Sequence, residues 1–211
     1  MPAELAFKNK FYRWFPLRFF LDRKIKTMVK GTVDFLEEFI KEGEKIVDIG
    51  GGAGWISQEL QIRKNTKNLI LDVTNLNQTD LPLVIYDGKN MPFADNTFDV
   101  AFLICVLHHC EDPERVLREA KRVVKKKIII IENIAKNPIG KFALCCKDAI
   151  LNIGFSLLAN SLKEIINLPF YFKTVPEWEQ IFNNLNLKLT YKKEFHPPIS
   201  HHSVAFVVQK K

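Results

Sequence analysis

The stretch Val47-Asp-Ile-Gly-Gly-Gly-Ala-Gly54 decides the fold, because a short apolar run passes there into a loop that is almost all glycine. The run that begins at Lys45 is typical of a buried strand. Glycine lets the backbone turn tightly after a strand, and it lets a ligand lie against the main chain. The spacing is G-x-G-x-G, with Asp48 two residues before the first glycine. A dinucleotide fingerprint, G-x-G-x-x-G, would need a glycine where Trp55 stands.

The rest of the chain alternates strand patterns with helical ones. Strands are predicted at 45–50, 68–72, 83–86, 98–107, 127–132, 187–195 and 204–209, and helices at 21–40, 55–63, 112–124, 142–158 and 174–185. Only about ten residues separate Asp72 from Leu83, too few for a helix, so residues 75–80 are predicted to form a loop. This alternation favours an α/β protein with a mostly parallel sheet, helices on both faces and an antiparallel strand at the end.

Polar residues gather where these strands end. Ligands of parallel sheets bind at the carboxyl ends of the strands. The glycine loop follows the first strand, Asp72 ends the second, Asp87 follows the third and His108 follows the fourth. We therefore expect one ligand site at this edge of the sheet.

The order and spacing of these motifs in residues 44–132 resemble those of the class I S-adenosylmethionine-dependent methyltransferases. Within that family, they are most similar to the small-molecule, "methyltransferase type 11"-like branch. Asp48 and the glycines look like the family's first motif, and Asp72 is similar to its ribose-binding acid. The resemblance implies a Rossmann-like, doubly wound fold with seven strands. It also implies S-adenosyl-L-methionine as cofactor and S-adenosylhomocysteine as product. The cofactor-binding residues that it implies are Asp48, Gly50, Gly51, Gly52, Gly54, Trp55, Asp72, Val73, Asp87, Gly88 and Cys105.

The chemistry of such an enzyme asks little of the protein beyond positioning. The sulfonium methyl group is already activated, so the protein mainly places the acceptor and excludes water. A hydroxyl or amine acceptor also needs a base, and His109 is the candidate; alternatively, His108 and His109 only shape the strand end. No metal is expected, because the four cysteines form no C-x-x-C pair and Glu132-Asn133 alone makes no divalent site. The apolar run around Cys105 predicts that this residue lies in the core.

Segments outside the shared fold are expected to build the acceptor pocket. We divide the chain into a basic, aromatic helical segment at 1–43 and a methyltransferase domain at 44–211, in which 133–175 is a helical insertion that caps the acceptor site. Both extra segments are rich in apolar residues. They favour a small, hydrophobic or lipid-like acceptor. The alternative is that the helices of the two segments only pack on one another and do not line an acceptor pocket. The alternatives are a cofactor-binding or interaction protein without turnover, and an RNA methyltransferase. The acceptor atom and the oligomeric state stay open.

The charge of the chain is concentrated near its start. The net charge is +7 over 211 residues, and residues 1–30 hold eight basic and two acidic side chains, a surplus of six. Residues 8–30 also carry aromatic side chains between the basic ones. This segment could bind an anionic membrane surface, could bind RNA, or could form a solvated helix that covers the sheet edge. No apolar run approaches the roughly 20 residues that span a bilayer. We expect a cytoplasmic protein, which would be peripheral at a membrane if residues 8–30 bind an anionic membrane surface.

Overall fold

A computed structural model describes residues 18–134, 144–146, 149–150, 171–195 and 202–211. Of the predicted helical pattern at 142–158, residues 144–146 and 149–150 are described and are helical, and the rest lies outside the described residues, as does most of the segment 133–175. The aromatic run before Arg18 also lies outside them. Within the described residues, no helix has both the length and the hydropathy to span a bilayer.

Seven strands form one sheet in the order β3-β2-β1-β4-β5-β7-β6. Their bounds are β1 (Lys45–Ile49), β2 (Lys67–Asp72), β3 (Leu83–Ile85), β4 (Phe98–Ile104), β5 (Val124–Asn133), β6 (Leu187–Phe195) and β7 (Ser203–Lys210). Strands β1 to β5 run parallel, and β7 lies antiparallel between β5 and β6. The predicted Rossmann-like, mostly parallel sheet with one antiparallel strand is confirmed.

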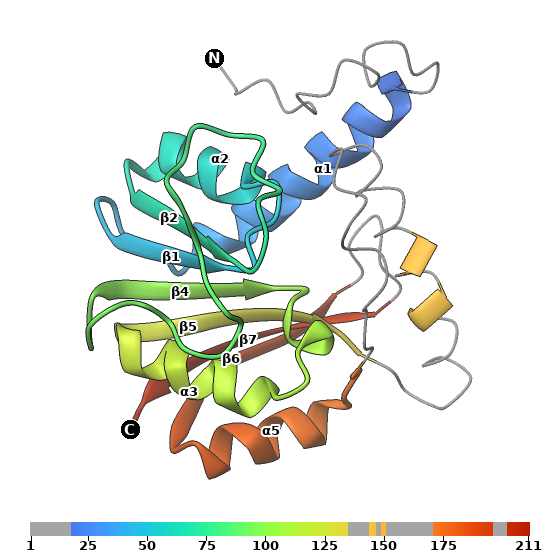
Figure 1. The fold of residues 1–211 in the computed structure, drawn as a ribbon. Coiled ribbons are helices and arrows are strands. Elements are labelled where there is room, and N and C mark those ends of the chain that lie inside the picture. Colours follow the sequence, from blue (N-terminus) through green and yellow to red (C-terminus); the bar gives the residue numbers. More distant parts are fainter. Residues whose placement is uncertain (1–17, 135–143, 147–148, 151–170, 196–201) are drawn as a thin grey trace.

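Helices cover both faces of the sheet (Figure 1). Their bounds are α1 (Arg18–Leu36), α2 (Trp55–Lys64), the 3-10 turn η2 (Leu107–His109), α3 (Pro113–Val123) and α5 (Val175–Asn184). In β1, Ile46 packs into a core with α1 and α2, whereas Val47 and Ile49 pack into a second core with α3 and α5. Successive strand residues point to opposite faces, so one apolar strand supplies both cores.

Local signals in the sequence place two helix starts. The side chain of Asp112 accepts a hydrogen bond from the Arg115 amide at 2.9 Å, with Pro113 in the first turn of α3. Thr174 and Glu177 form the predicted capping box at the start of α5. Each side chain satisfies a backbone donor that the helix itself leaves unpaired.

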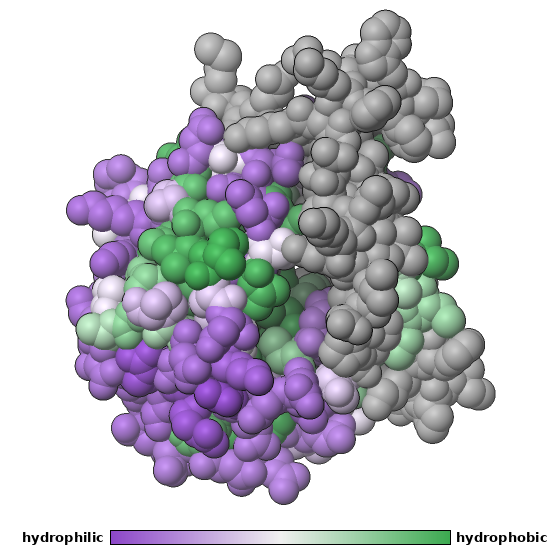
Figure 2. Space-filling view, viewed as in Figure 1, coloured by the Kyte–Doolittle hydropathy of each residue, from purple (hydrophilic) through white to green (hydrophobic). Residues whose placement is uncertain are grey.

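Two segments at the carboxyl edge shape the site. No helix forms between β2 and β3, as predicted, and the Gln78 amide of that link donates to the Ala53 carbonyl at 3.0 Å. Strand β4 ends at Ile104 rather than at 107, because Cys105 has a φ of 55° and turns the chain into η2. Figure 2 shows hydrophobic surface over β2 and the segment after it, whereas the surface over α3 is hydrophilic.

Candidate functional site

The loop after β1 has a backbone that glycine adopts most easily. Gly50, Gly52 and Gly54 have φ values of 67°, 52° and 77°, in the left-handed region that costs other residues free energy. The Gly50 amide donates to the Leu71 carbonyl at 2.7 Å, so the loop leaves β1 while still bonded to β2. Gly54 directly precedes the first residue of α2.

The space around these glycines differs from one position to the next. A Cβ at Gly50 would lie 2.5 Å from Val106, and one at Gly54 would lie 2.6 Å from Ile70. A side chain at either position would therefore force these neighbours to shift. A Cβ at Gly52 would have no atom within 4 Å. The loop is closed against the protein at Gly50 and Gly54 and open at Gly52, and this opening is a cradle that a ligand can fill.

Asp72 ties the end of β2 to this loop. Its Oδ2 accepts from the Gly52 amide at 3.0 Å, and its Oδ1 accepts from the Val73 amide at 2.7 Å. The residue is 7% exposed. The structure thus brings the two features that the sequence singled out, the glycine loop and the acid at the end of β2, into direct contact.

Asp48 supports the loop from beneath. The side chain is buried on the α2 face of β1, and its Oδ2 accepts from the Ser57 hydroxyl at 2.6 Å. Burial raises the pKa of Asp48 to about 7, although the hydrogen bond from Ser57 lowers it; the charge of Asp72 raises it further. A Cβ at Gly51 would lie 2.8 Å from the Asp48 carboxyl, so this acid packs directly under the loop.

The end of β3 adds a tight turn and an apolar surface. The Asp87 carboxylate accepts from the Lys89 and Asn90 amides at 2.8 and 2.7 Å. These backbone hydrogen bonds, that of Asn90 first, lower the pKa of Asp87 below its ordinary value. Val73 is 58% exposed, and a Cβ at Gly88 would lie 3.2 Å from it. Val73 and Gly88 therefore form one surface beside Asp72.

The end of β4 carries both histidines. Glu132, at the end of β5, lies 2.6 Å from the Nδ1 atom of His108, and both side chains are buried. The ring of His109 lies 4.1 Å from that of His108, centroid to centroid, and is half-buried. Cys105 is exposed, so its prediction as a core residue was wrong: the left-handed backbone there directs it out of the sheet.

Two further ionisable groups near this edge are held neutral. Burial raises the pKa of the Cys110 thiol to about 12, with the charges of Glu132 and Asp112 adding to the shift. Burial also raises the pKa of the Tyr86 phenol. Neither group supplies an anion near neutral pH.

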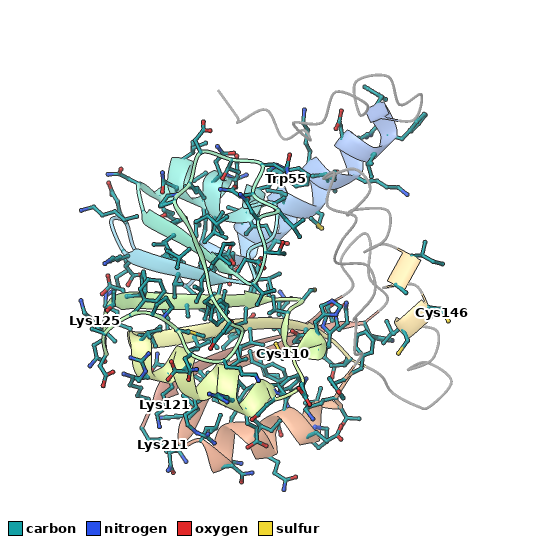
Figure 3. All side chains as sticks on the ribbon, in the orientation of Figure 1. Trp55, Cys110, Lys121, Lys125, Cys146 and Lys211 are labelled. Carbon is teal, nitrogen blue, oxygen red and sulfur yellow. The ribbon has the colours of Figure 1, made fainter. Side chains whose placement is uncertain are left out.

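The structure distributes the predicted cofactor residues unevenly. Trp55, which Figure 3 labels at the start of α2, is buried in the core that α1 and α2 share. Sequence reasoning missed Ser57 as the partner of Asp48, and it set Glu132 aside as a metal ligand without another role. An acid that ends an apolar strand was the signal at Glu132, as it was at Asp72.

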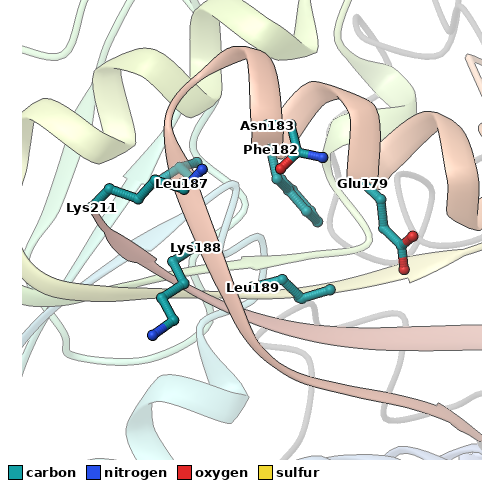
Figure 4. A pocket seen from close by; sticks show the side chains of 7 residues that line it. All are labelled: Glu179, Phe182, Asn183, Leu187, Lys188, Leu189 and Lys211. Atoms are coloured by element: carbon teal, nitrogen blue, oxygen red, sulfur yellow. The ribbon is translucent and has the colours of Figure 1, made fainter.

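A shallow pocket of about 330 Å³ lies elsewhere, between α5 and β6. Figure 4 shows its lining, which includes Phe182, Leu187 and Lys211. Leu187 begins β6, and β6 runs parallel to β1 through β5. The pocket is therefore at the amino edge of the sheet, opposite the glycine loop.

Comparison with known proteins fits this geometry. Residues 47–131 match the model of a family described as a methyltransferase domain. A demethylmenaquinone methyltransferase of Corynebacterium kroppenstedtii is 40% identical over 91 residues, which cover 40% of this chain and 39% of that protein. A malonyl-[acyl-carrier protein] O-methyltransferase of Buchnera aphidicola is 30% identical over 105 residues, 46% of this chain and 42% of that protein.

Solved structures extend the likeness beyond the matched residues. A SAM-dependent methyltransferase structure from Methanosarcina mazei has a TM-score of 0.62 and 18% identity, covering 83% of this chain and 96% of that one. The fold is therefore the Rossmann-like fold of this solved methyltransferase. Over residues 47–131 the chain is thus similar to methyltransferases, and its fold is similar to that of a SAM-dependent methyltransferase. The chain spans about two fifths of the length of the two curated relatives named above.

Proposed function

We propose that the protein transfers the methyl group of S-adenosylmethionine to a small, hydrophobic or lipid-like acceptor by in-line displacement. The observation that carries this proposal is the contact between the Asp72 carboxylate and the Gly52 amide. This contact places a carboxylate that can accept hydrogen bonds from ligand hydroxyls beside the backbone of the glycine loop. Both lie at the sheet edge where such folds bind ligands. An adenosine with a ribose diol and an extended chain suits this donor and acceptor set.

The residues present fit the cofactor. The open side of Gly52 leaves room for a ligand against the backbone. Asp72 would hold the ribose hydroxyls, and the exposed Val73 beside Gly88 would lie against the adenine. Asp87 holds the turn that carries Gly88. When bound, S-adenosylmethionine supplies an electrophilic methyl group on a sulfonium.

The chain's own contribution to transfer is positioning and proton removal. His109 stands at the end of η2, where the turn after β4 meets the glycine loop through Val106 and Gly50. A half-buried imidazole at this edge can take the proton from a hydroxyl or amine acceptor. We assign His109 this role as a base.

The proposed acceptor class is supported by the relatives and by the sequence. By the words of their names, the two relatives methylate a demethylmenaquinone and a malonyl group on an acyl-carrier protein, which fits a lipid-like acceptor here. The segment 133–175 leaves β5 at this same edge and is rich in apolar residues. We propose that it caps the acceptor site.

Peripheral contact with a membrane is part of this proposal. Phe19 and Phe20 on α1 are 68% and 64% exposed. Arg23, Lys24 and Lys30 are exposed on the turns that follow. Aromatic rings with basic neighbours favour an anionic lipid surface, where a lipid-like acceptor would be found.

Calorimetry with S-adenosylhomocysteine tests the cofactor site. We expect Asp72→Ala to weaken binding at least about tenfold, because each hydrogen bond to a charged group contributes about 1.5–3 kcal/mol. Asp34→Ala, at an exposed ion pair with Arg63, is the control and should bind as the wild type does. Equal affinity in a folded Asp72→Ala protein would contradict the proposal.

The acceptor is found by supplying S-adenosylmethionine with a labelled methyl group to a cell extract. Label is expected in the lipid or small-molecule fraction. Label in the RNA fraction would replace the proposed acceptor by RNA. Cofactor binding without label in any fraction would instead make the protein a cofactor-binding protein without turnover.

A further inference from the structure

Glu132 is a buried residue whose carboxylate, among the described residues, is hydrogen-bonded to the turn after β4. The residue has an exposed fraction of 0%. Its Oε1 accepts from the Val106 and Leu107 amides at 2.9 and 2.7 Å, and its Oε2 lies 2.6 Å from His108 Nδ1. A buried charge is tolerated only when it is paired or hydrogen-bonded this fully.

The first two contacts hold the backbone of the turn. Val106 and Leu107 lead into η2, where the first amides have no partner within the turn itself. The His109 amide then donates to the Val106 carbonyl at 2.9 Å. Because Val106 also packs against Gly50, the place of His109 relative to the glycine loop depends on Glu132.

The third contact orients the His108 ring. An ionised carboxylate only accepts hydrogen bonds, so Glu132 favours the tautomer of His108 that carries its proton on Nδ1. The ring is stacked on Phe172 at 4.6 Å with an interplanar angle of 15°. The Tyr171 amide donates to the His108 carbonyl at 2.7 Å. The chain that returns to the sheet before α5 is thereby joined to the same turn.

We propose that Glu132 is a positioning residue for methyl transfer, because it holds the turn after β4 at the carboxyl edge of the sheet. Its carboxylate holds the backbone of 106–107, keeps the proton of His108 on Nδ1, and so sets where His109 stands relative to the cofactor loop. This inference rests on the proposed function, because it assigns the turn to methyl transfer. Glu132 itself touches neither cofactor nor acceptor and acts through the two histidines.

The variant Glu132→Gln changes the contact with the His108 ring while it keeps the hydrogen bonds to the Val106 and Leu107 amides. The glutamine Oε1 can still accept from both amides, and its NH₂ group then faces His108 Nδ1. Since NH₂ is a donor, the His108 proton should move to Nε2. Long-range ¹⁵N–¹H correlation spectra of protein labelled at histidine report the tautomer directly. We expect the tautomer to change, S-adenosylhomocysteine affinity to stay within about threefold, and methyl transfer to the labelled extract fraction to fall at least about tenfold.

Glu119→Gln is the matched control. Glu119 also accepts from a backbone amide, that of Met91 at 2.9 Å, and pairs with Arg122, but it lies on α3. This variant should leave the His108 tautomer and methyl transfer unchanged. His108→Asn retains an N–H donor for Glu132, so hydrogen exchange of the Leu107 amide should stay slow there and become faster in Glu132→Ala.

Two results would overturn the proposal. One is an unchanged His108 tautomer and unchanged methyl transfer in Glu132→Gln. The other is slow Leu107 exchange in a folded Glu132→Ala protein. Failure of the wild type to bind S-adenosylhomocysteine is distinguishable from both, because it refutes the proposed function and removes the role in methyl transfer, whatever the tautomer.

Discussion

Replacing Asp48 with asparagine is expected to stabilise the protein increasingly as the pH rises from about 4 to about 7, and to change its stability little at about pH 4. Asp48 is 3% exposed, and the asparagine carbonyl can still accept from the Ser57 hydroxyl. The substitution thus keeps the size and the hydrogen bond and removes only the capacity to ionise.

The size of the effect follows from the pKa. Burial, together with the charge of Asp72 and against the hydrogen bond of Ser57, raises the pKa of Asp48 from 3.8 to about 7. Each pKa unit corresponds to about 1.36 kcal/mol, so ionising Asp48 in the folded protein costs up to about 4 kcal/mol.

The sign of the pH dependence follows from proton counting. Because the folded pKa lies above the unfolded value, the folded protein holds a proton between about pH 4 and 7 that the unfolded chain has lost. The contribution of Asp48 to stability is complete below the unfolded pKa and is lost as the pH rises through the folded pKa. The asparagine of the variant cannot ionise, so the advantage of Asp48→Asn should grow from nearly zero at about pH 4 to about 4 kcal/mol at about pH 8.

Urea unfolding of both proteins at intervals between these pH values measures the difference. Asp99→Asn is the control of opposite sign, because the Lys45 amide and the charge of Lys126 lower the pKa of Asp99. That variant should be less stable than the wild type by an amount that changes little between about pH 5 and 8, because the ordinary and the lowered pKa of Asp99 both lie below this range. A difference between Asp48→Asn and the wild type that stays constant across the range would refute the reasoning.

Other substitutions separate cofactor binding, folding and membrane contact. Gly52→Val should abolish binding of S-adenosylhomocysteine in calorimetry and lower the melting temperature only slightly, because the Cβ meets no atom and only the backbone at φ 52° is strained. Gly54→Val should destabilise the fold itself in thermal unfolding, since its Cβ would lie 2.6 Å from Ile70; a normal melting temperature would contradict this packing. Changing Phe19 and Phe20 together to Glu should reduce sedimentation with phosphatidylserine-containing vesicles at least about fivefold, whereas Ile62→Glu, an exposed apolar residue of α2, should not. Equal loss in both variants would argue against a site on α1.

Features that depend on a few neighbouring residues could be predicted from the sequence. The glycine loop, the caps at Asp112 and Thr174 and the missing helix between β2 and β3 all follow from backbone preferences and from the length of a segment. The place of Asp72 at the edge was also predictable, because the residue that ends a parallel strand lies at its carboxyl end.

What these residues touch was decided by the tertiary structure. The parallel register pairs Ile104 of β4 with Ile131 of β5, which brings Glu132 beside the turn that follows β4. His108 and Glu132 are 24 residues apart, and nothing in either local pattern predicts their contact. Burial of Asp48 under α2 likewise depends on how the helix packs on the sheet.

Cys105 shows the difference between what the local sequence predicts and what the tertiary structure decides. Its apolar neighbours predict a buried strand, and the strand is indeed buried up to Leu103. The chain leaves the sheet one residue after Ile104 because Glu132 holds the next two amides and Gly50 packs against Val106. Periodicity and turn preferences act over a few residues and can be recognised in the sequence, whereas the end of a strand and the partners of a buried charge depend on segments that only folding brings together.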